Sequence, residues 1–590
     1  MSSYASKGNG IGDRRERPAP ESTPPSLRGF WAPFALALLA GVAVRTYALQ
    51  SQILVDDEWH AIHQLLRHDS YLGLFHLASN DHSPPLTMLY RALANTVGLS
   101  ETLMRLPSLA AGLLALFALP LLLRPIVGDG SALAFAFLLG LSPLHVFYSR
   151  YARPYAIVML AGFLALLAFH AWWSTGRGRA LFWFVLAGVI APVLNLPALP
   201  LILAPFVWAV SRDVRRPMRV TPRRLATAGV PLLLGWLILL GPLVALADRE
   251  ALAGKIARAP VDLRALVEAA PFFLGSANLV AQAILSALAL AGMATLWRRD
   301  RSWTSFMLTV AVVDLACLLV AGVHGTQYGI VLARYAIGVL PVVLVFVASG
   351  AARLVAAVPA LHASSARHWL AAAGVGLLAL LGPLPATFTR PNNFTNHASL
   401  QHSYAPSYFA EFRPSVHLAT YDALARNPPG ACLVIEAPLS VWHSYAYYQR
   451  LHRQRVAIGL TGSAAEGQMP ADDRRFRFAN AVHLGDPEGL ARLRANYIIL
   501  HKDMAREMGD PFGQGSPPMD HWVTRLTARY GAPVVDDHWL AVFRIAPGSA
   551  CAVGLASHAV PLAPKLGVAT ATRSLFRGRA AGESNSDPAD

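Results

Sequence analysis

Long apolar runs separated by short polar segments fill most of the chain up to about residue 390. A run of about 20 apolar residues is the length that an α-helix needs to cross the hydrocarbon core of a bilayer. The pattern predicts about eleven membrane-spanning helices, several of which contain Pro or Gly, residues that membrane helices tolerate. These are residues 30–49, 106–123, 130–148, 154–173, 180–195, 196–211, 225–247, 279–297, 303–323, 332–350 and 369–388.

An acidic stretch follows the first predicted span. Asp56, Asp57 and Glu58 stand side by side there, in a chain that is otherwise poor in charge. Asp56 is predicted to be a helix N-cap, with the other two acids in the first turn, where negative charge suits the helix dipole. Trp59 and Ile62 recur at helical spacing, which predicts a helix that lays one apolar face on a membrane surface.

A second short helix is predicted over Leu86–Val97. This apolar segment is interrupted by Arg91 and Asn95 and is too short to span a bilayer. We therefore expect an interfacial helix that lies along the membrane surface.

The chain changes character after the last predicted span. Residues 390–551 are polar and aromatic, and strand-like runs alternate with helical stretches, which predicts a small α/β domain. The strand-like runs are 432–436, 497–500 and 539–545, and the helical stretches are 415–426 and 487–495. Residues 1–29 and 552–590 have the composition of flexible tails, so residues 30–389 form the predicted membrane module.

Composition supports a membrane protein and the charge pattern orients it. The chain is 54% hydrophobic and 14% charged, with a net charge of +16. The surplus of Arg falls in short loops on one side, as the positive-inside rule expects, so it does not indicate nucleic-acid binding. This topology places the acidic stretch, the loops 149–155, 248–278 and 324–335, and everything after about residue 390 on the outer side of a bacterial inner membrane.

The three cysteines form no metal-binding pattern. Cys432 and Cys551 flank the first and last strand-like runs of the outer domain, in a compartment that permits disulfides, so we expect them to be bonded. Cys317 lies within a predicted span and is expected to stay reduced.

Charged and hydrogen-bonding residues collect at the outer ends of the predicted spans. The candidate catalytic acids are Asp56, Asp57 and Glu58, and the candidate substrate-binding residues are His82, Arg105, Arg150, Arg153, Tyr155, Arg334 and Tyr335. One acidic cluster with several cations suits a reaction whose leaving group is a lipid phosphate. Such a group leaves as a stable anion without a proton, so one carboxylate base suffices and cations hold the phosphate.

Each of these residues also has a structural interpretation. The acids could do no more than cap a helix, and Arg150, Arg153 and Arg334 could anchor spans among lipid headgroups. The tyrosines could belong to an interfacial aromatic belt. His60 and His63 have helical spacing for a metal, but no third ligand is evident; no metal site is assigned, and a divalent cation remains an open alternative.

Taken together, the motifs resemble the GT-C glycosyltransferases, in the group that contains protein O-mannosyltransferases and the lipid A aminoarabinose transferase. The matching residues are Asp57-Glu58, His82–Leu86, Gly98–Ser108, Ser149–Tyr155 and Arg334-Tyr335. The resemblance implies that Asp57 deprotonates the acceptor in an inverting transfer from a polyprenyl-phosphate sugar. The partners it implies are this donor, membrane lipid and a cell-envelope acceptor.

The chain departs from that family at two places. Ser83 stands where the aminoarabinose transferase has a Lys before its Pro-Pro pair, and Arg150 and Arg153 stand in a turn where that family has an acid. The alternative function is a transporter or flippase of lipid-linked sugars, which should carry mid-membrane ionisable residues and a repeat. Asp314 is one such residue, but no repeat is evident. A third alternative is an inactive scaffold that binds a partner.

Overall fold

A computed structural model gives the fold of the 590-residue chain. It describes residues 27–358, apart from short gaps at 48, 50–53, 55, 69, 78–81, 214–220, 248–261, 277, 324–325 and 327. It further describes 369, 374, 376, 414–429, 431–437, 452–456, 496–502, 519–537, 540–545 and 551. The predicted span at 369–388 and the predicted helix at 487–495 therefore lie outside the continuous described segments.

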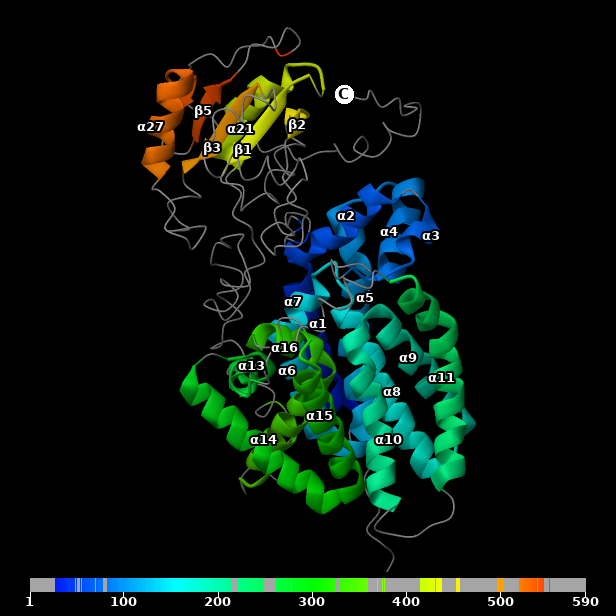
Figure 1. The fold of residues 1–590 in the computed structure, drawn as a ribbon. Coiled ribbons are helices and arrows are strands. Elements are labelled where there is room, and N and C mark those ends of the chain that lie inside the picture. Colours follow the sequence, from blue (N-terminus) through cyan, green and yellow to red (C-terminus); the bar gives the residue numbers. More distant parts are fainter. Residues whose placement is uncertain are drawn as a thin grey trace, which may run out of the picture.

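Apolar helices, most of them long, form a bundle that makes up the larger part of the molecule (Figure 1). They are α1 (Leu27–Thr46), α5 (Glu101–Val127), α6 (Asp129–Leu141), α7 (Pro143–Ser149), α8 (Tyr155–Thr175), α9 (Gly178–Leu194), α10 (Leu199–Asp213), α11 (Thr221–Ala245), α14 (Leu279–Arg299), α15 (Arg301–Ala321) and α17 (Leu340–Ala356). Shorter helices are α2 (Trp59–Arg67), α3 (Tyr71–Leu74), α4 (Pro84–Thr96), α13 (Arg264–Leu274) and α16 (Gly329–Tyr335).

The helices confirm a polytopic membrane protein. Among the described residues, seven helices are long and apolar enough to cross a membrane, or up to eight if the bent pair α6 and α7 is one span. The predicted spans at 180–195 and 196–211 correspond to α9 and α10, which have 17 and 15 residues and are shorter than a usual span. Each of the first ten predicted spans coincides with a helix, although two of them are interrupted.

The predicted span 130–148 is wrong as a single straight helix. It breaks at Ser142 and the two parts, α6 and α7, meet at a bend of 58°. Pro143 has no N–H to continue the helical hydrogen bonds, and the Ser142 side chain instead accepts from the backbone of His145 at 3.4 Å. The predicted span 332–350 is also interrupted, because α16 ends at Tyr335 and a 3-10 turn, Ile337–Val339, precedes α17.

Close helix packing depends on small residues, which the contact between α14 and α17 shows most clearly. A Cβ at Gly292 would lie 1.9 Å from the Phe346 carbonyl oxygen, and one at Gly350 would lie 1.9 Å from that of Leu288. Glycine at both positions therefore lets the two backbones touch, as is common between membrane helices.

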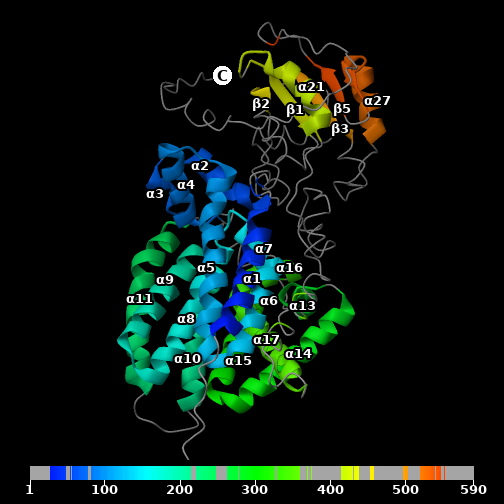
Figure 2. The ribbon, with the colours of Figure 1, turned by 180° about the vertical axis from the view of Figure 1, so that it is seen from behind.

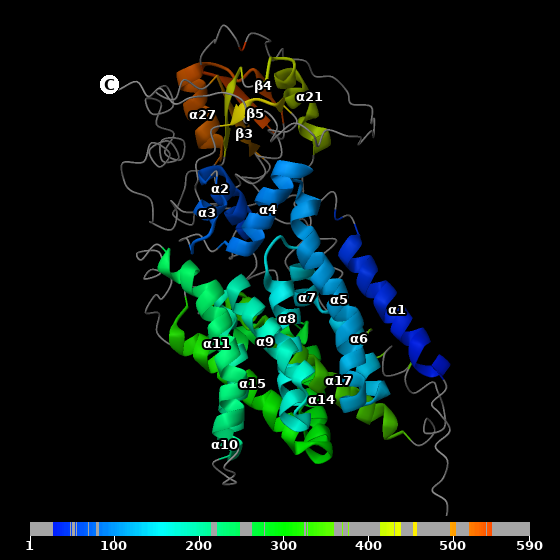
Figure 3. The same cartoon turned by 90° about the vertical axis from the view of Figure 1, so that its right-hand side faces the viewer.

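Helices α2, α3 and α4 form a cap at one end of the bundle (Figures 1 and 3). Ile62 of α2 is buried in a cluster with Leu65, Leu86 and Tyr90. The predicted membrane-facing position of Ile62 is therefore wrong, because α2 packs this face on α4. The predicted short helix at 86–97 is confirmed as α4, which begins earlier, at Pro84, since Pro suits the first turn of a helix.

A small five-stranded sheet lies beyond this cap (Figures 1 and 2). Its strands, in the order β2-β1-β3-β5-β4, are β1 (Leu433–Ala437), β2 (Arg455–Val456), β3 (Tyr497–His501), β4 (Val535–Asp536) and β5 (Leu540–Arg544). β1 is parallel to β2 and β3, whereas β5 is antiparallel to β3 and β4. With helices α21 (Pro414–Ala425) and α27 (Met519–Tyr530), this confirms the predicted α/β domain.

The disulfide prediction is confirmed. Cys432 and Cys551 are bonded, with their Cα atoms 5.1 Å apart. The bond ties the segment that precedes β1 to the end of the described domain. Cys317 on α15 is a free thiol, as expected.

A carboxyl group is buried in the core of this domain. Glu436 on β1 is fully buried; its Oε2 accepts from the Tyr421 hydroxyl at 3.3 Å and its Oε1 lies 3.8 Å from Nε2 of His452. Burial raises the pKa of Glu436 from its usual 4.5 to about 8. Burial also lowers the pKa of His452. Between these two pH values of 4.5 and 8, the folded domain therefore holds a proton at Glu436 that the unfolded chain releases.

The stability of the domain should consequently fall as pH rises from about 4.5 to about 8. Glu436→Gln keeps the shape and removes the ionisation, so we expect it to slow hydrogen exchange of the β1 amides at pH 8 and to change it little at pH 5. Hydrogen exchange of the purified full-length protein, corrected for the intrinsic effect of pH, measures this. Asp422→Asn, an exposed change on α21, is the control. Equal effects of Glu436→Gln at both pH values would contradict the assignment.

Candidate active site

The acidic stretch forms a short turn at the cap end of the bundle. Asp56, Asp57 and Glu58 make one 3-10 turn, and the α-helix begins only at Trp59. The predicted N-cap at Asp56 is therefore wrong; Glu58 holds that position, and its side chain makes no capping hydrogen bond. The Asp56 side chain lies outside the described part. The carboxylates of Asp57 and Glu58 have different partners.

Glu58 joins neighbouring segments through a buried ion pair. It is fully buried and accepts two hydrogen bonds from Arg105, Nε to Oε1 at 2.9 Å and Nη2 to Oε2 at 2.8 Å. The backbone N–H of Ala152 also donates to Oε1, at 2.7 Å. Paired carboxylate and guanidinium groups satisfy each other in this buried position. Glu58 and Arg105 thereby join the acidic turn to α5 and to the 149–155 turn.

Arg150 holds the end of α1. Its guanidinium is buried, and Nη1 donates to the carbonyl oxygens of Val44, Arg45 and Tyr47 at 3.1, 3.0 and 2.8 Å. The last carbonyls of a helix have no partner within the helix, so a cation there satisfies them. Arg150 therefore secures the end of α1, and its predicted contact with substrate stays a prediction.

Arg45 is a buried residue that the sequence analysis missed. Its guanidinium donates to the carbonyls of Gly140 at 2.8 Å and Leu139 at 3.2 Å, and to the Ser149 hydroxyl at 3.2 Å. Its Nη2 also lies 2.9 Å from Nδ1 of His145. It thus binds the carbonyls exposed by the α6–α7 break. The available signal was an arginine inside an apolar run, because ionisable residues within a span rarely lack a function.

Asp57 meets Arg334, which is far away in the sequence. Oδ2 of Asp57 accepts from Nη1 of Arg334 at 2.6 Å, and both side chains are largely buried. Oδ1 of Asp57 lies 3.7 Å from Nε2 of His60, one turn further along the chain. Arg334 stands on α16, so the break before α17 places this cation beside the acid.

Tyrosine rings surround the guanidinium of Arg334. Its carbon lies 5.8 Å from the centre of the Tyr155 ring and 5.1 Å from that of Tyr335, distances typical of cation–π contacts. Arg153 also approaches Tyr155, at 5.7 Å from the ring centre and with Nη2 3.5 Å from the hydroxyl. The fold thus brings together Asp57, Arg153, Tyr155, Arg334 and Tyr335. All are buried or nearly so, unlike the residues of an exposed aromatic belt.

His82 is engaged within the cap. Its Nδ1 lies 3.0 Å from the Thr87 hydroxyl and its Nε2 lies 3.0 Å from the carbonyl oxygen of His76. The Thr87 hydroxyl donates to the carbonyl of Ser83 at 3.0 Å. These contacts fix the entry into α4, which is a structural use of the predicted substrate-binding histidine.

The described residues contain no group of three His, Cys, Asp or Glu side chains arranged to hold a metal ion. Because the side chains of Asp56 and His63 lie outside the described set, this finding covers only part of the acidic stretch.

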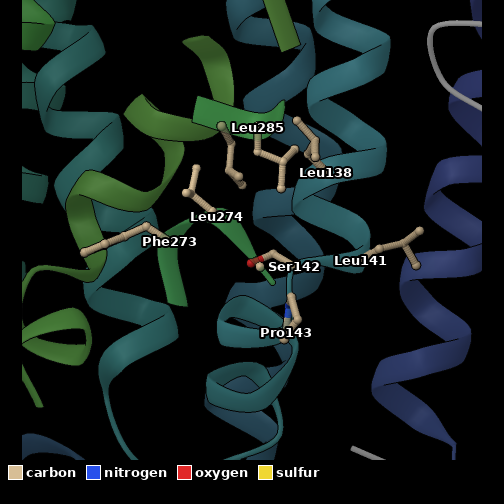
Figure 4. Close-up of a pocket in the computed structure, with 9 residues that line it drawn as sticks. Leu138, Leu141, Ser142, Pro143, Phe273, Leu274 and Leu285 are labelled. Carbon is tan, nitrogen blue, oxygen red and sulfur yellow. The ribbon is translucent and has the colours of Figure 1, made fainter. Parts of the chain in front are cut away.

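An apolar groove lies beside the break between α6 and α7. The room inside it is only about 10 Å³, enough for about one water molecule, so it is a shallow crevice between side chains. Leu138, Leu274 and Leu285 gather there, next to Ser142 and Pro143 (Figure 4). Its lining is mostly apolar, and its size gives no room for a sugar or for a lipid chain.

Comparison with known proteins gives only distant similarity. No family profile and no curated protein sequence matches the chain. ArnT from Cupriavidus metallidurans in the apo state is 14% identical, with 89% of this chain and 98% of that chain covered and a TM-score of 0.49. The same protein bound to undecaprenyl phosphate is 15% identical, with 89% and 99% covered and a TM-score of 0.46.

A third solved structure is the archaeal oligosaccharyltransferase AglB from Archaeoglobus fulgidus, in complex with an inhibitory peptide and a dolichol-phosphate. It is 13% identical, with 81% of this chain and 70% of that chain covered and a TM-score of 0.42. The chain is thus similar to these proteins over most of its length, at identities and TM-scores that assign it no activity.

Proposed function

We propose that this protein is an integral-membrane glycosyltransferase that moves a sugar, with inversion, from a polyprenyl-phosphate donor to a cell-envelope acceptor. The observation that carries the proposal is the contact between Asp57 and Arg334, a buried acid and cation joined at 2.6 Å at the end of a membrane-type bundle. Arg153 and two tyrosine rings complete the same site.

The proposed mechanism needs one general base and cations that bind the leaving phosphate. Asp57 takes the proton from the acceptor hydroxyl, and the acceptor oxygen then bonds to the anomeric carbon. The bond from that carbon to the phosphate oxygen breaks, and its electron pair stays on the lipid phosphate. Arg334 and Arg153 stabilise the charge that develops there, which is where preorganised cations lower a barrier most. The leaving phosphate needs no proton, so no second acid is required.

The position of the site at the end of membrane-type helices suits a donor carried by a lipid. The turn that carries Asp57 leads into α2, which lies at the cap end of helices that are long and apolar enough to cross a membrane, so a membrane-borne donor can reach it by lateral diffusion. A nucleotide sugar would instead call for a Gly-rich phosphate loop, and the sequence shows none.

We further propose that the site faces the outer side of a bacterial inner membrane. The turn between α14 and α15 carries Arg298, Arg299 and Arg301 and lies at the end of the bundle opposite the cap (Figure 1). Because basic loops favour the cytoplasmic side, this charge supports an outer position for the cap and for the α/β domain.

A transporter remains the alternative with a specific observation behind it. Asp314 on α15 is buried inside a candidate span, next to the backbone of Leu201. Buried acids within spans often mark ion paths. The clustering of Asp57, Arg153 and Arg334 at the bundle end favours the enzyme, since a transport site lies near the bilayer midplane.

Deleting the gene and complementing it tests the function. We expect mass spectrometry of envelope lipids and glycans to show one missing sugar, restored by the wild type and by Asp129→Asn but not by Asp57→Asn. Purified protein should use a polyprenyl-phosphate sugar and ignore UDP- and GDP-sugars. Transfer from a nucleotide sugar, without any lipid carrier, would refute the donor assignment. Movement of the intact lipid-linked sugar across vesicles, without transfer, would favour the transporter.

A further inference from the structure

The proposed base, Asp57, is engaged in an ion pair in the structure. The Asp57 carboxylate accepts from Arg334 at 2.6 Å, and the exposed fractions of the two side chains are only 7% and 12%. A guanidinium next to a carboxylate favours the ionised carboxylate and weakens its affinity for a proton. Low exposure strengthens this effect, because solvent screens the pair less. Asp57 in this pair is therefore a poorer proton acceptor than the same carboxylate would be alone.

Arg334 is at the same time suited to bind a phosphate. A guanidinium presents N–H donors in a planar fork that matches phosphate oxygens, and its charge persists at any physiological pH. In this structure, Asp57 occupies one of those donors. The Tyr155 and Tyr335 rings also lie against the guanidinium and can hold it in place when the carboxylate leaves.

The helix that carries Arg334 is held from the other side. The backbone N–H of Gly329, the first residue of α16, donates to Oε2 of Glu268 on α13 at 3.3 Å. A Cβ at Gly329 would lie 2.4 Å from the carbonyl carbon of Glu268, so the two helices touch at the backbone. An exchange of partners at Arg334 is therefore a movement of its side chain and of Asp57, while α16 stays in place.

We propose that the phosphate of the lipid donor and the Asp57 carboxylate compete for Arg334, so that donor binding frees Asp57 to act as the base. This inference rests on the function proposed above. As the bond from sugar to phosphate breaks, the phosphate gains negative charge and attracts Arg334 more strongly. Asp57 becomes a better proton acceptor at the moment when the acceptor hydroxyl loses its proton. When the lipid phosphate leaves, Arg334 returns to Asp57 and the base is masked again.

Competition has a thermodynamic signature that a purely structural ion pair lacks. If Asp57 and phosphate exclude each other at Arg334, removing the charge of Asp57 must strengthen phosphate binding. We expect Asp57→Asn to bind a polyprenyl monophosphate about tenfold more tightly than the wild type, as loss of a charge-assisted competitor should allow. Arg334→Gln should weaken binding by about tenfold or more, because the phosphate loses its guanidinium.

Isothermal titration of the full-length protein in nanodiscs with a polyprenyl monophosphate measures these affinities, and the corresponding polyprenol separates phosphate recognition from chain binding. Arg124 and Asp129 form a matched pair at the far end of α5, with Nε to Oδ1 at 2.8 Å, so Asp129→Asn is the control and should change nothing. The double variant Asp57→Asn with Arg334→Gln is decisive. If the two groups compete, Asp57→Asn no longer tightens phosphate binding once Arg334 is absent. If the negative charge of Asp57 only repels the phosphate at a distance, Asp57→Asn still tightens binding in the absence of Arg334.

The outcomes separate this inference from the function beneath it. If the wild type binds the polyprenyl monophosphate no better than the polyprenol, the proposed donor is wrong and the inference falls with it. If the phosphate binds but Asp57→Asn leaves the affinity unchanged or weaker, competition is refuted and the donor assignment stands. The same holds if the effect of Asp57→Asn persists without Arg334. Should Arg334→Gln fail to fold, Arg334→Lys, which keeps the charge and loses the fork, takes its place with a smaller expected loss.

Discussion

Asp57→Asn is expected to lower the rate of sugar transfer by about 10²-fold to 10⁴-fold, the usual contribution of a positioned general base. The asparagine has the same shape, and its amide oxygen can still accept from Arg334, so the fold should remain intact. What is lost is the negative oxygen that receives the acceptor's proton. Transfer by purified protein from a polyprenyl-phosphate sugar, at equal amounts of folded enzyme, is the measurement.

Two controls define this result. Asp129→Asn removes a carboxylate from an ion pair at the opposite end of α5 and should leave transfer unchanged. Asp56→Asn alters the neighbouring acid and should have a milder effect than Asp57→Asn. Native turnover by folded Asp57→Asn protein would show that Asp57 is not the base.

Glu58→Gln is expected to destabilise the protein by about 3–5 kcal/mol, the typical cost of removing one partner from a buried ion pair. The change leaves Arg105 charged in a fully buried position, opposite a neutral amide. It also weakens the acceptor for the Ala152 N–H, which holds the 149–155 turn. We expect a reduced yield of monodisperse protein and a lower unfolding temperature, followed by fluorescence-detected size exclusion after heating.

A second variant separates a structural from a catalytic role of Glu58. Replacing both partners, Glu58→Gln with Arg105→Met, removes the uncompensated charge and should recover part of the stability, and with it part of the transfer activity. Asp129→Asn, in the more exposed pair with Arg124, should cost no more than about 1 kcal/mol. If Glu58→Gln protein were as stable as the wild type yet inactive, Glu58 would belong to the chemistry instead of the scaffold.

The lengths of the apolar runs predicted most of the membrane helices. Each of the first ten predicted spans returns as helix, since backbone groups in lipid must be satisfied within the segment and only a helix achieves this in a single run. The sequence did not show where a span breaks. Pro143 and Pro192 both stand within predicted spans, yet only the first accompanies a break between helices. At the first break, Arg45 satisfies the carbonyls of Leu139 and Gly140 from another helix.

The α/β domain was predictable for a similar reason. Strands β1, β3 and β5 are short apolar runs bounded by polar segments, and Cys432 and Cys551 stand at the two ends of this pattern. Strands β2 and β4 have two residues each and were not predicted. The order of the strands, with β1 between β2 and β3, was not predicted. The spacing of apolar residues within a strand does not show which distant strand it pairs with. The buried acid at Glu436 was missed, since one carboxylate in an apolar run does not reveal its burial.

By itself the sequence determined which residue types gather at the outer ends of the helices: three acids, four arginines and two tyrosines among the candidates. It could not divide them by role, because each arginine has the same charge and a similar distance from a predicted span end. Only the tertiary structure decided that Arg105 and Arg150 bind Glu58 and the end of α1, whereas Arg334 meets Asp57. The physical reason is that a buried charge needs a partner that is close in space. Asp57 and Arg334 are far apart in the sequence, so only the folded bundle brings them together.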